Sequence, residues 1–567
     1  MTKKHIILIL ALSLVSTLLI QWNLTRAILF DDYLQKPNIT YENNDESYYL
    51  SLISESAKGH GTIGNPFLKE WSGERYLYVP LNVWLIGSLQ RVFHLDVKGI
   101  SILFDYVAVY ILMVMVFVLF VSVFRYNVFG YLAAGAYIFL PRMFDMWKRP
   151  ISPQVNFIPL FLFFSFYFSK ISFWKREAAL AFSAGAMFYT YPYHWTFALV
   201  LLGLSDTWAF YQDKKISIKY FYKYAGIAAM SAGYIANFLS IYHLSYYAES
   251  MGRIGALASR MPAGYYTQAM IIGLLTAYFV LRWFGRTKYA LEHSDIDLDK
   301  IVLGLFAGIV VLNQQIATNM QLEFNTHYLP VILLFMALFV SSLLFTLRQH
   351  AIGKNKNIVL AFSAGFVVSL MFSSVRNEAR EYPALFSEKS IPGSFMVYDW
   401  FRQNHITDEV IYAPDELADD IPMYTGNYVV FSELARLQLM STSDLLGRFV
   451  YFDITNKTIT DDPMARQRDV FGIFYTAQMQ KDAVIARIGA LLTRRPAVPK
   501  DMADYVPQYF NDTRAIRQRV SAQDLEKYLD TYHATYIVYR LQDRDMIYKK
   551  IRGDIVYESA EYIIKKR

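Results

Sequence analysis

Apolar runs alternate with short polar segments along residues 1–380. Eleven of these runs have the length and apolarity that predict helices crossing a hydrocarbon layer. They are residues 6–22, 100–124, 128–144, 153–168, 178–190, 195–210, 224–241, 265–281, 301–318, 327–345 and 358–372. The first run could instead be a cleaved signal peptide, but no small-x-small site follows it, and we interpret it as a span.

The charges of the intervening loops indicate an orientation. Alternate loops are rich in lysine and arginine, which marks the cytoplasmic side and places the N-terminus there. Their basic residues are Arg125, Lys170, Lys175, Arg176, Lys214, Lys215, Lys219, Lys223, Arg282, Arg286, Lys288, Arg348, Lys354 and Lys356. An odd number of spans then places the first loop and everything beyond about residue 373 outside the cell.

Composition agrees with a polytopic α-helical membrane protein, since 54% of the 567 residues are hydrophobic and only 18% are charged. The net charge of +7 would suit nucleic acid, but its placement in alternate loops explains it, and we expect no nucleic-acid partner. The absence of cysteine excludes disulfides and thiolate ligands. Any metal must therefore use oxygen or imidazole ligands.

Beyond the last apolar run the pattern changes to short alternating segments with more charge. We predict a membrane domain over residues 1–380, with a first outer loop at 23–99, and an extracytoplasmic α/β domain over 381–567. An interrupted apolar stretch at 76–93 predicts an interfacial helix. In the outer domain the pattern predicts strands at 409–413, 428–431 and 535–540 and helices at 394–404, 462–494 and 522–532.

The first outer loop contains an acidic pair, Asp45 and Glu46, followed by Ser47, Tyr48 and Tyr49. A carboxylate at a partly desolvated membrane mouth can act as a general base on an acceptor hydroxyl or amine. The alternative is a pair of solvated loop carboxylates. The turn-rich stretch that follows, which includes His60, favours a path back to the membrane.

The other outer loops supply candidate binding groups. Arginines on the outer side, against the topology rule, suggest phosphate partners, although headgroup anchoring or solvation would also explain them. Dense amides in the fifth outer loop predict a cavity lining, because polar groups beside spans are costly otherwise. The candidates are Arg149, Arg253 and Arg260 for phosphate, and His60, Gln154, Tyr193, His194, Gln315 and His327 for substrate.

The chain resembles the GT-C superfamily in four features. These are a first span, a long outer loop with Asp-Glu-x-Tyr-Tyr, many further spans and an outer C-terminal domain. The members of this superfamily are integral-membrane glycosyltransferases, such as protein O-mannosyltransferases, oligosaccharyltransferase catalytic subunits and the aminoarabinose transferase of lipid A. The resemblance implies that Asp45, with Glu46 beside it, is the catalytic base or aligns the acceptor. Some members bind a divalent cation near first-loop acids, so the resemblance allows Mg²⁺ or Mn²⁺, while no cofactor is assigned.

We therefore predict an inverting glycosyltransferase that moves a sugar from a polyprenyl-phosphate donor to a protein, glycan or lipid acceptor outside a prokaryotic plasma membrane. The alternative is a transporter or lipid-linked-sugar flippase. That function would need ionisable groups within several spans, and the main candidates are Asp105 and Asp206. A non-catalytic scaffold is a third hypothesis.

Overall fold

A computed structural model defines the architecture. It describes residues 2–35, 45–77, 80–149, 152–213, 218–258, 260, 264–283, 296–321, 325–350, 355–386, 393–455, 522–543 and 551–567, and a few residues between 482 and 493.

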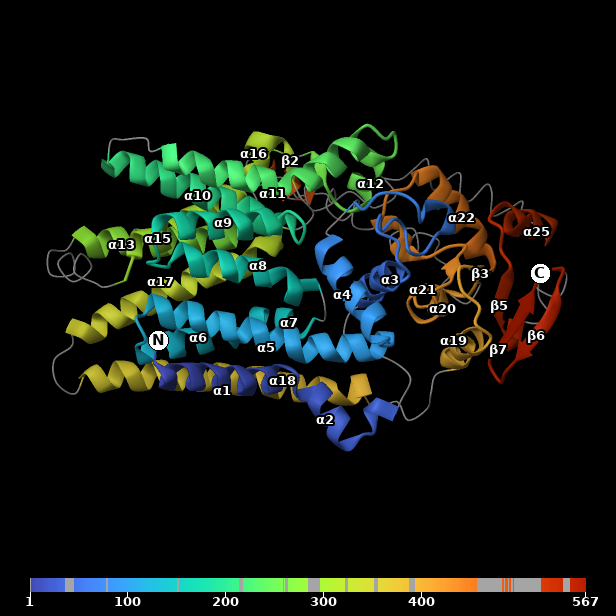
Figure 1. Cartoon of the computed structure of the whole chain (residues 1–567), viewed down its shortest axis with the longest axis horizontal. Coiled ribbons are helices and arrows are strands. Elements are labelled where there is room, and N and C mark those ends of the chain that lie inside the picture. The colour runs from blue at the N-terminus through green and yellow to red at the C-terminus, as the bar shows by residue number, and fades with distance from the viewer. Residues whose placement is uncertain are drawn as a thin grey trace.

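A bundle of long helices forms one half of the molecule and a smaller mixed domain forms the other (Figure 1). A helix lies at each of the eleven predicted positions. These helices are α1 (Lys3–Ile20), α5 (Val97–Val123), α6 (Val128–Ile138), α8 (Ser152–Tyr167), α9 (Phe173–Met187), α10 (Pro192–Asp213), α11 (Ile218–Tyr242), α13 (Tyr265–Trp283), α15 (Leu298–Leu312), α17 (Leu329–His350) and α18 (Asn355–Phe386).

The burial of these helices fits a bundle that faces lipid. Five described helices, α1, α5, α11, α17 and α18, are long and apolar enough to cross a membrane. In α5 and α17, 61% of the apolar window is buried, whereas only 11% of the window of α18 is buried. The exposed face of α18 carries large apolar side chains at Ile358, Phe362, Phe366, Val368 and Phe372. An apolar stripe on the outside is expected where the solvent is hydrocarbon. The count of eleven spans stays a prediction.

Two predicted spans are divided. The run 128–144 ends as α6, and a separate amphipathic helix, α7 (Pro141–Lys148), follows it, because a proline at the first helical position starts a new helix. The run 301–318 likewise ends as α15, and a short α16 (Gln314–Thr318) follows Asn313. A short α2 (Trp22–Phe30) continues beyond α1.

The first outer loop is more helical than its sequence suggested. The acidic pair opens a helix, α3 (Asp45–Ala57), and the predicted interfacial helix is present as α4 (Pro80–Phe93). The two helices lie in close contact at Gly87, where a Cβ atom would stand 2.7 Å from the side chain of Ser56. Whether α4 lies in a membrane interface stays a prediction.

The outer domain contains a five-stranded sheet with the order β4-β3-β5-β7-β6. The three predicted strands are confirmed as β3 (Val410–Tyr412), β4 (Tyr428–Val429) and β5 (Tyr536–Arg540), which pair in parallel. Two antiparallel strands, β6 (Asp554–Glu558) and β7 (Tyr562–Lys566), extend the sheet and were not predicted.

Helices surround this sheet and connect its strands. They are α19 (Gly393–Gln403), α20 (Asp415–Ala418), α21 (Ile421–Thr425), α22 (Thr442–Thr455) and α25 (Ala522–Thr531). The first and last of them match the predicted helices at 394–404 and 522–532. Most of the predicted helix at 462–494 lies outside the described residues.

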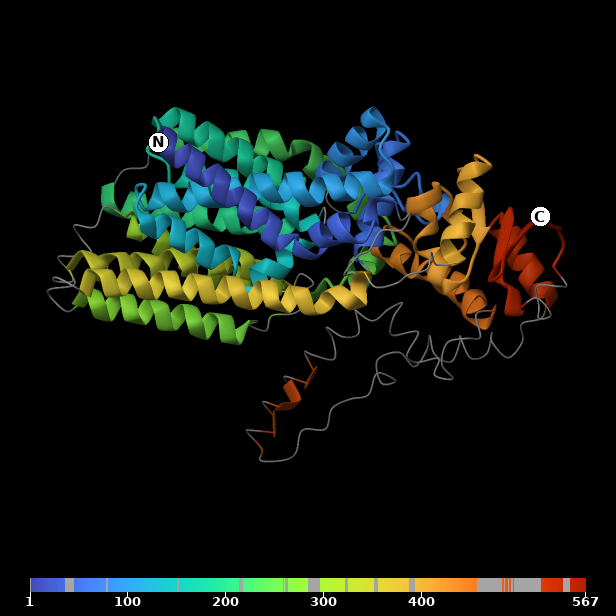
Figure 2. The same cartoon turned by 90° about the horizontal axis from the view of Figure 1, so that it is seen from below.

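The first outer loop and the outer domain form one body at the end of the bundle (Figure 2). Their apolar side chains share one core, and the backbone amide of Val429 donates to the carbonyl oxygen of Phe67 (2.7 Å). Arg448 of α22 is buried and binds Glu70 (2.9 Å). The first outer loop is therefore fixed to the outer domain, and the acidic pair lies where these two parts meet.

Candidate functional site

Residues from three outer loops meet around His327, just before α17. The hydroxyl of Tyr191 is hydrogen-bonded to Nδ1 of His327. The ring of Tyr193 stacks on the imidazole, with centroids 4.8 Å apart and planes at 18°. The start of α10 thus holds the residues that precede α17, and two of the candidate substrate-binding residues, Tyr193 and His327, lie against each other.

Two arginines of the second outer loop act on the same imidazole. Burial and, after it, the positive charges of Arg149 and then Arg142 together lower the pKa of His327 from 6.5 to about 4. Arg142 lies on the exposed face of α7, and Arg149 follows the end of this helix. His327 is therefore neutral at pH 7. We call the five residues Arg142, Arg149, Tyr191, Tyr193 and His327 the outer-end cluster.

The outer-end cluster has the chemistry of an anion site. Guanidinium groups bind phosphate oxygens through charge-assisted hydrogen bonds. When the Tyr191 hydroxyl donates to Nδ1 of His327, the tautomer that remains carries its proton on Nε2 and supplies a neutral donor. No carboxylate among the described residues forms an ion pair with Arg142.

Arg142 was missed as a candidate because it fell inside the predicted span 128–144. Pro141, directly before it, was the available signal for a new helix. Neighbouring Lys148 is not a headgroup anchor. It forms an ion pair with Glu378 of α18, and both side chains are buried. This pair fixes α7 to the bundle.

Gln154 and His194 lie behind the cluster. Gln154 is fully buried and donates to Asp105 (3.3 Å) and to the carbonyl oxygen of Trp147 (3.1 Å). Nδ1 of His194 is 3.1 Å from the carbonyl oxygen of Asn156, and the ring is also fully buried. We infer that both residues hold the helices that carry the cluster, and direct contact with a substrate finds no support for either.

The acidic pair lies at the junction with the outer domain. Glu46 is buried in the first turn of α3, with 5% of its surface exposed. Its neighbours are fixed by the outer domain, because Ser47 donates to Asp420 (3.0 Å) and Tyr48 accepts from Gln438 (2.7 Å). The side chain of Asp45 lies outside the described part of the structure. The pair thus begins a helix that both domains hold in place.

His60 lies just beyond the other end of α3. Its Nδ1 is 2.5 Å from a carboxylate oxygen of Glu55, which is buried and also accepts from Tyr428 (2.8 Å). The carboxylate raises the pKa of the Tyr428 phenol, after burial as the larger cause. His60 therefore lies in the contact between α3 and β4, through Glu55.

The structure gives no support to Arg253 as a clamp for a lipid phosphate. Arg253 is 3% exposed, at the end of α12 (Tyr247–Arg253), and the hydrogen bonds of its guanidinium fix the outer domain. The acceptors are Ser250, Thr442 and the carbonyl oxygens of Arg436, Gln438 and Met440. A guanidinium whose donors are used in this way has little capacity left for a phosphate.

Two other predicted residues lie on neighbouring loops. Arg260 is exposed. Gln315 of α16 is fully buried and donates to the carbonyl oxygen of Leu312 (3.0 Å). The fourth and fifth outer loops pair through β1 (Leu257–Ala258) and β2 (Met320–Gln321).

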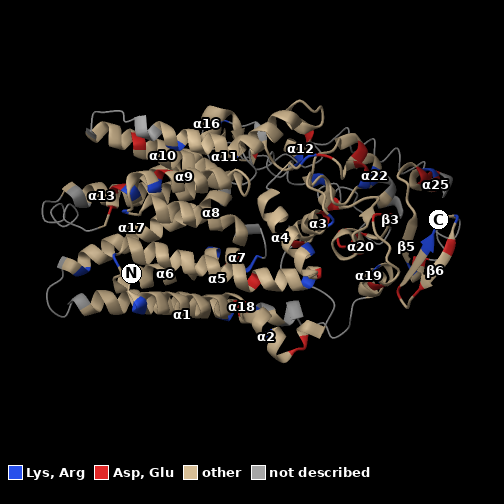
Figure 3. Cartoon of the chain, viewed as in Figure 1, with Lys and Arg blue, Asp and Glu red and all other residues tan. Residues whose placement is uncertain are grey.

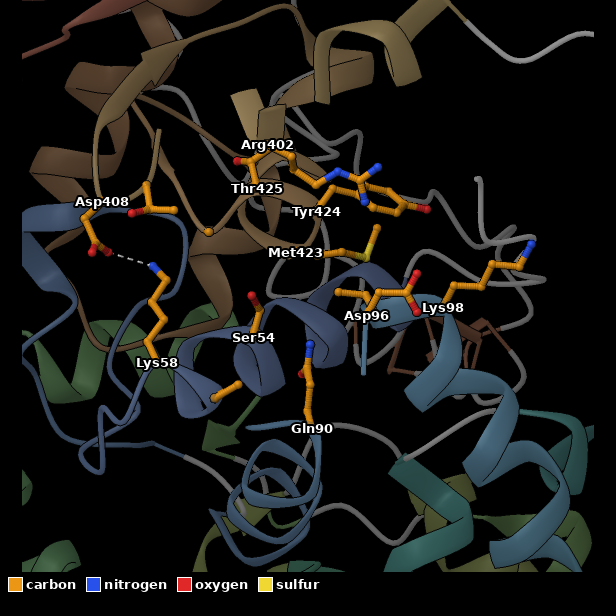
Figure 4. A pocket seen from close by; sticks show the side chains of 14 residues that line it. Ser54, Lys58, Gln90, Asp96, Lys98, Arg402, Asp408, Met423, Tyr424 and Thr425 are labelled. Carbon is orange, nitrogen blue, oxygen red and sulfur yellow. Dashed lines mark hydrogen bonds and ion pairs between the residues drawn. The ribbon is translucent and has the colours of Figure 1, made fainter. Parts of the chain in front are cut away.

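A cleft of about 410 Å³ separates the first outer loop from the outer domain (Figure 4). Lys58 and Asp408 form an ion pair (3.0 Å) at one side, and Arg402 and Tyr424 face the α3 helix from the outer domain. The lining carries charges of both signs. Three cations, Lys58, Lys98 and Arg402, and two carboxylates, Asp96 and Asp408, contribute to it.

Within the described residues, no group of three or more histidine, aspartate or glutamate side chains could hold a metal ion. The Mg²⁺ or Mn²⁺ that the resemblance allowed is not assigned to any residue.

Comparison with solved structures finds similarity at low sequence identity. No protein-family model and no curated protein match the chain. ArnT from Cupriavidus metallidurans, solved with undecaprenyl phosphate, aligns over 100% of this chain and 98% of its own, with 10% identity and a TM-score of 0.44. The apo structure of ArnT aligns over 99% of this chain and 97% of its own, at the same identity and TM-score. The chain is similar to ArnT in overall outline, and the similarity is too low to assign an activity.

Proposed function

We propose that the protein is an inverting glycosyltransferase that takes a sugar from a polyprenyl-phosphate donor on the outer side of the membrane. The outer-end cluster is the observation that supports this, because it combines arginines, a neutral imidazole and stacked aromatic rings at the ends of apolar helices. Arginines bind phosphate oxygens through charge-assisted hydrogen bonds, the neutral imidazole can add a donor, and the ends of apolar helices place both beside the hydrocarbon layer. The proposal depends on these residues and not on the similarity to ArnT.

The reaction assigns one role to each group. The carboxylate of Asp45, with Glu46 beside it, takes the proton from an acceptor hydroxyl or amine. The acceptor atom then forms a bond to the anomeric carbon, and the bond from that carbon to the phosphate oxygen breaks. Polyprenyl phosphate leaves with the bonding electrons, and Arg149 and Arg142 stabilise its charge. We keep Arg260 as a further phosphate contact on the fourth loop.

The transport alternative has less support. Asp105 accepts a hydrogen bond from Gln154, and Asp206 forms an ion pair with Lys223 (2.9 Å). Both ionisable candidates are therefore engaged within the bundle, and neither supplies an open polar pathway.

The test is transfer in reconstituted vesicles. Purified protein is supplied with radiolabelled polyprenyl-phosphate sugar, and label on a soluble or lipid acceptor is measured separately from label that crosses the bilayer. We expect transfer by the wild type and a loss of about 10- to 100-fold for Arg149→Ala, because a charged hydrogen bond contributes about 1.5–3 kcal/mol. Lys170→Ala is the matched control, because this exposed cation follows α8 at the other end of the bundle. Movement of the donor across the bilayer without transfer would reject the proposal in favour of a flippase.

A further inference from the structure

A second cleft, of about 440 Å³, lies between the first outer loop, the fourth outer loop and the outer domain. Its volume falls within the range of about 300–1,000 Å³ that ligand pockets occupy. Three carboxylates line it, those of Glu70, Glu74 and Asp444, together with the rings of Trp71, Tyr246 and Tyr532. These residues lie outside the outer-end cluster and have no part in the transfer step described above.

Hydrogen bonds hold these side chains in fixed positions. The buried guanidinium of Arg448 binds Glu70 (2.9 Å) and Asp444 (3.0 Å) and lies 3.8 Å from the centre of the Tyr532 ring. The indole nitrogen of Trp71 donates to Asp444 (2.7 Å). A lining that is already ordered loses little conformational entropy when a ligand binds.

Several groups in the cleft keep capacity for a ligand. Tyr246 donates to Oε1 of Glu74 (2.9 Å), and Arg448 donates to Oε2 of Glu70. The second oxygen of each of these two carboxylates accepts no hydrogen bond from the described residues. With three carboxylates and one guanidinium, the cleft is negative. Such a lining favours hydroxyl and ammonium donors and disfavours carboxylates and phosphates.

We propose that this cleft binds a saccharide that is neutral or carries amino groups. Carboxylate oxygens accept from the hydroxyl groups of a sugar, and the rings of Trp71 and Tyr246 offer apolar surface to its C–H faces. If the proposed transfer is correct, this saccharide belongs to the acceptor. The binding itself does not depend on the transfer.

The test uses the full-length purified protein in detergent and three probes of equal length: cellopentaose, fully deacetylated chitopentaose and pentagalacturonic acid. Affinities are measured by calorimetry. We expect the neutral and amino probes to bind, and the acidic probe to bind at least about tenfold more weakly. Failure of the neutral and amino probes to bind, or tighter binding of the acidic probe, would overturn the proposal.

Variants locate the binding within the cleft. Glu74→Gln removes one charged acceptor, and we expect about tenfold weaker binding of the amino probe, in line with the loss of a charged hydrogen bond. Asp554→Asn removes an exposed carboxylate of β6 outside the cleft and is the matched control. Glu70→Gln repeats the test should Glu74→Gln lower the melting temperature. Equal affinity of wild type and both cleft variants would also overturn the proposal.

The outcome is separable from that of the proposed function. Saccharide binding that survives in a protein without transferase activity would support the cleft and reject only the enzyme. Transfer by a protein whose cleft variants keep full affinity for the saccharide would support the enzyme and reject only the cleft as the binding site.

Discussion

Each end of the helical bundle carries a group of charged residues, and the two groups differ in how their charges are balanced. At the end away from the outer domain, Lys223 of α11 lies between Glu177 of α9 (3.4 Å) and Asp206 of α10 (2.9 Å). Arg176 binds the same glutamate (2.9 Å), so two cations face two acids. We call these four residues the far-end network.

At the outer end, the described residues do not pair every cation with an acid. The outer-end cluster has two arginines that depress the pKa of a histidine, and no ion pair involves Arg142 in the described part of the chain. Charged residues are sparse along the helices between the two ends (Figure 3). A balanced network holds helices together, whereas Arg142, which forms no ion pair among the described residues, keeps its charge available to an anion. We therefore expect the far end to contribute stability and the outer end to contribute substrate binding.

The largest expected effect is on catalysis at the outer end. Asp45→Asn removes the proposed base, and we expect the rate of transfer to fall by about 10²- to 10⁴-fold. The melting temperature should stay within a few degrees, because this substitution removes charge without changing side-chain size. Initial rates and thermal unfolding of the purified variant check both statements. A fully active Asp45→Asn protein would move the base to Glu46 or contradict the mechanism.

The far end should respond in the opposite way. Lys223→Met leaves the buried Glu177 and the partly exposed Asp206 without their shared cation, and loss of one partner from a buried pair such as Lys223 and Glu177 typically costs about 3–5 kcal/mol. We expect a clear drop in melting temperature, while protein that remains folded keeps the KM of the wild type for the donor. A variant with normal stability and a changed KM would mean that the far end takes part in binding.

Most helices and three strands could be predicted from the sequence. The elements that were missed depend on contacts between distant parts of the chain. Apolar run length places all of the main helices, because burial in lipid imposes a long continuous pattern. β3, β4 and β5 follow from alternating segments. The strands β6 and β7 were missed, since only β7 is well buried and their pairing is tertiary.

The site itself was predicted in part. Tyr193 and His327 were both named as candidates and lie in contact, whereas the role of Arg253 was assigned from its loop position alone. Four of its five acceptors come from residues 436–442, far along the chain, and local sequence gives no sign of them. Arg142 was hidden for a different reason, because α7 continues an apolar run and its separation depends on one proline.

A smaller effect should separate binding from chemistry at the outer end. Arg142→Ala removes one of the two charges near the leaving group, and we expect the KM for the donor to rise about tenfold. Steady-state kinetics over a range of donor concentrations measure this. Arg142→Lys should recover part of the loss because the charge is kept, and an equal KM for the alanine and lysine variants would argue against a role for that charge.

The smallest effect is a shift in pH dependence caused by the same arginine. The pKa of His327 in the folded protein, about 4, lies below its ordinary value of 6.5, so the folded state binds this proton less readily than the unfolded state. The resulting stability is fully present above pH 6.5 and is lost as the pH falls from there to about 4. Since burial is the largest cause and Arg142 the smallest, Arg142→Ala should raise the midpoint of this loss by less than about one pH unit. Melting temperatures between pH 4 and 7 measure the shift, and His327→Gln supplies the baseline without this titration. A midpoint that moves down, or a His327→Gln profile identical to the wild type, would show that these arginines do not act on the imidazole.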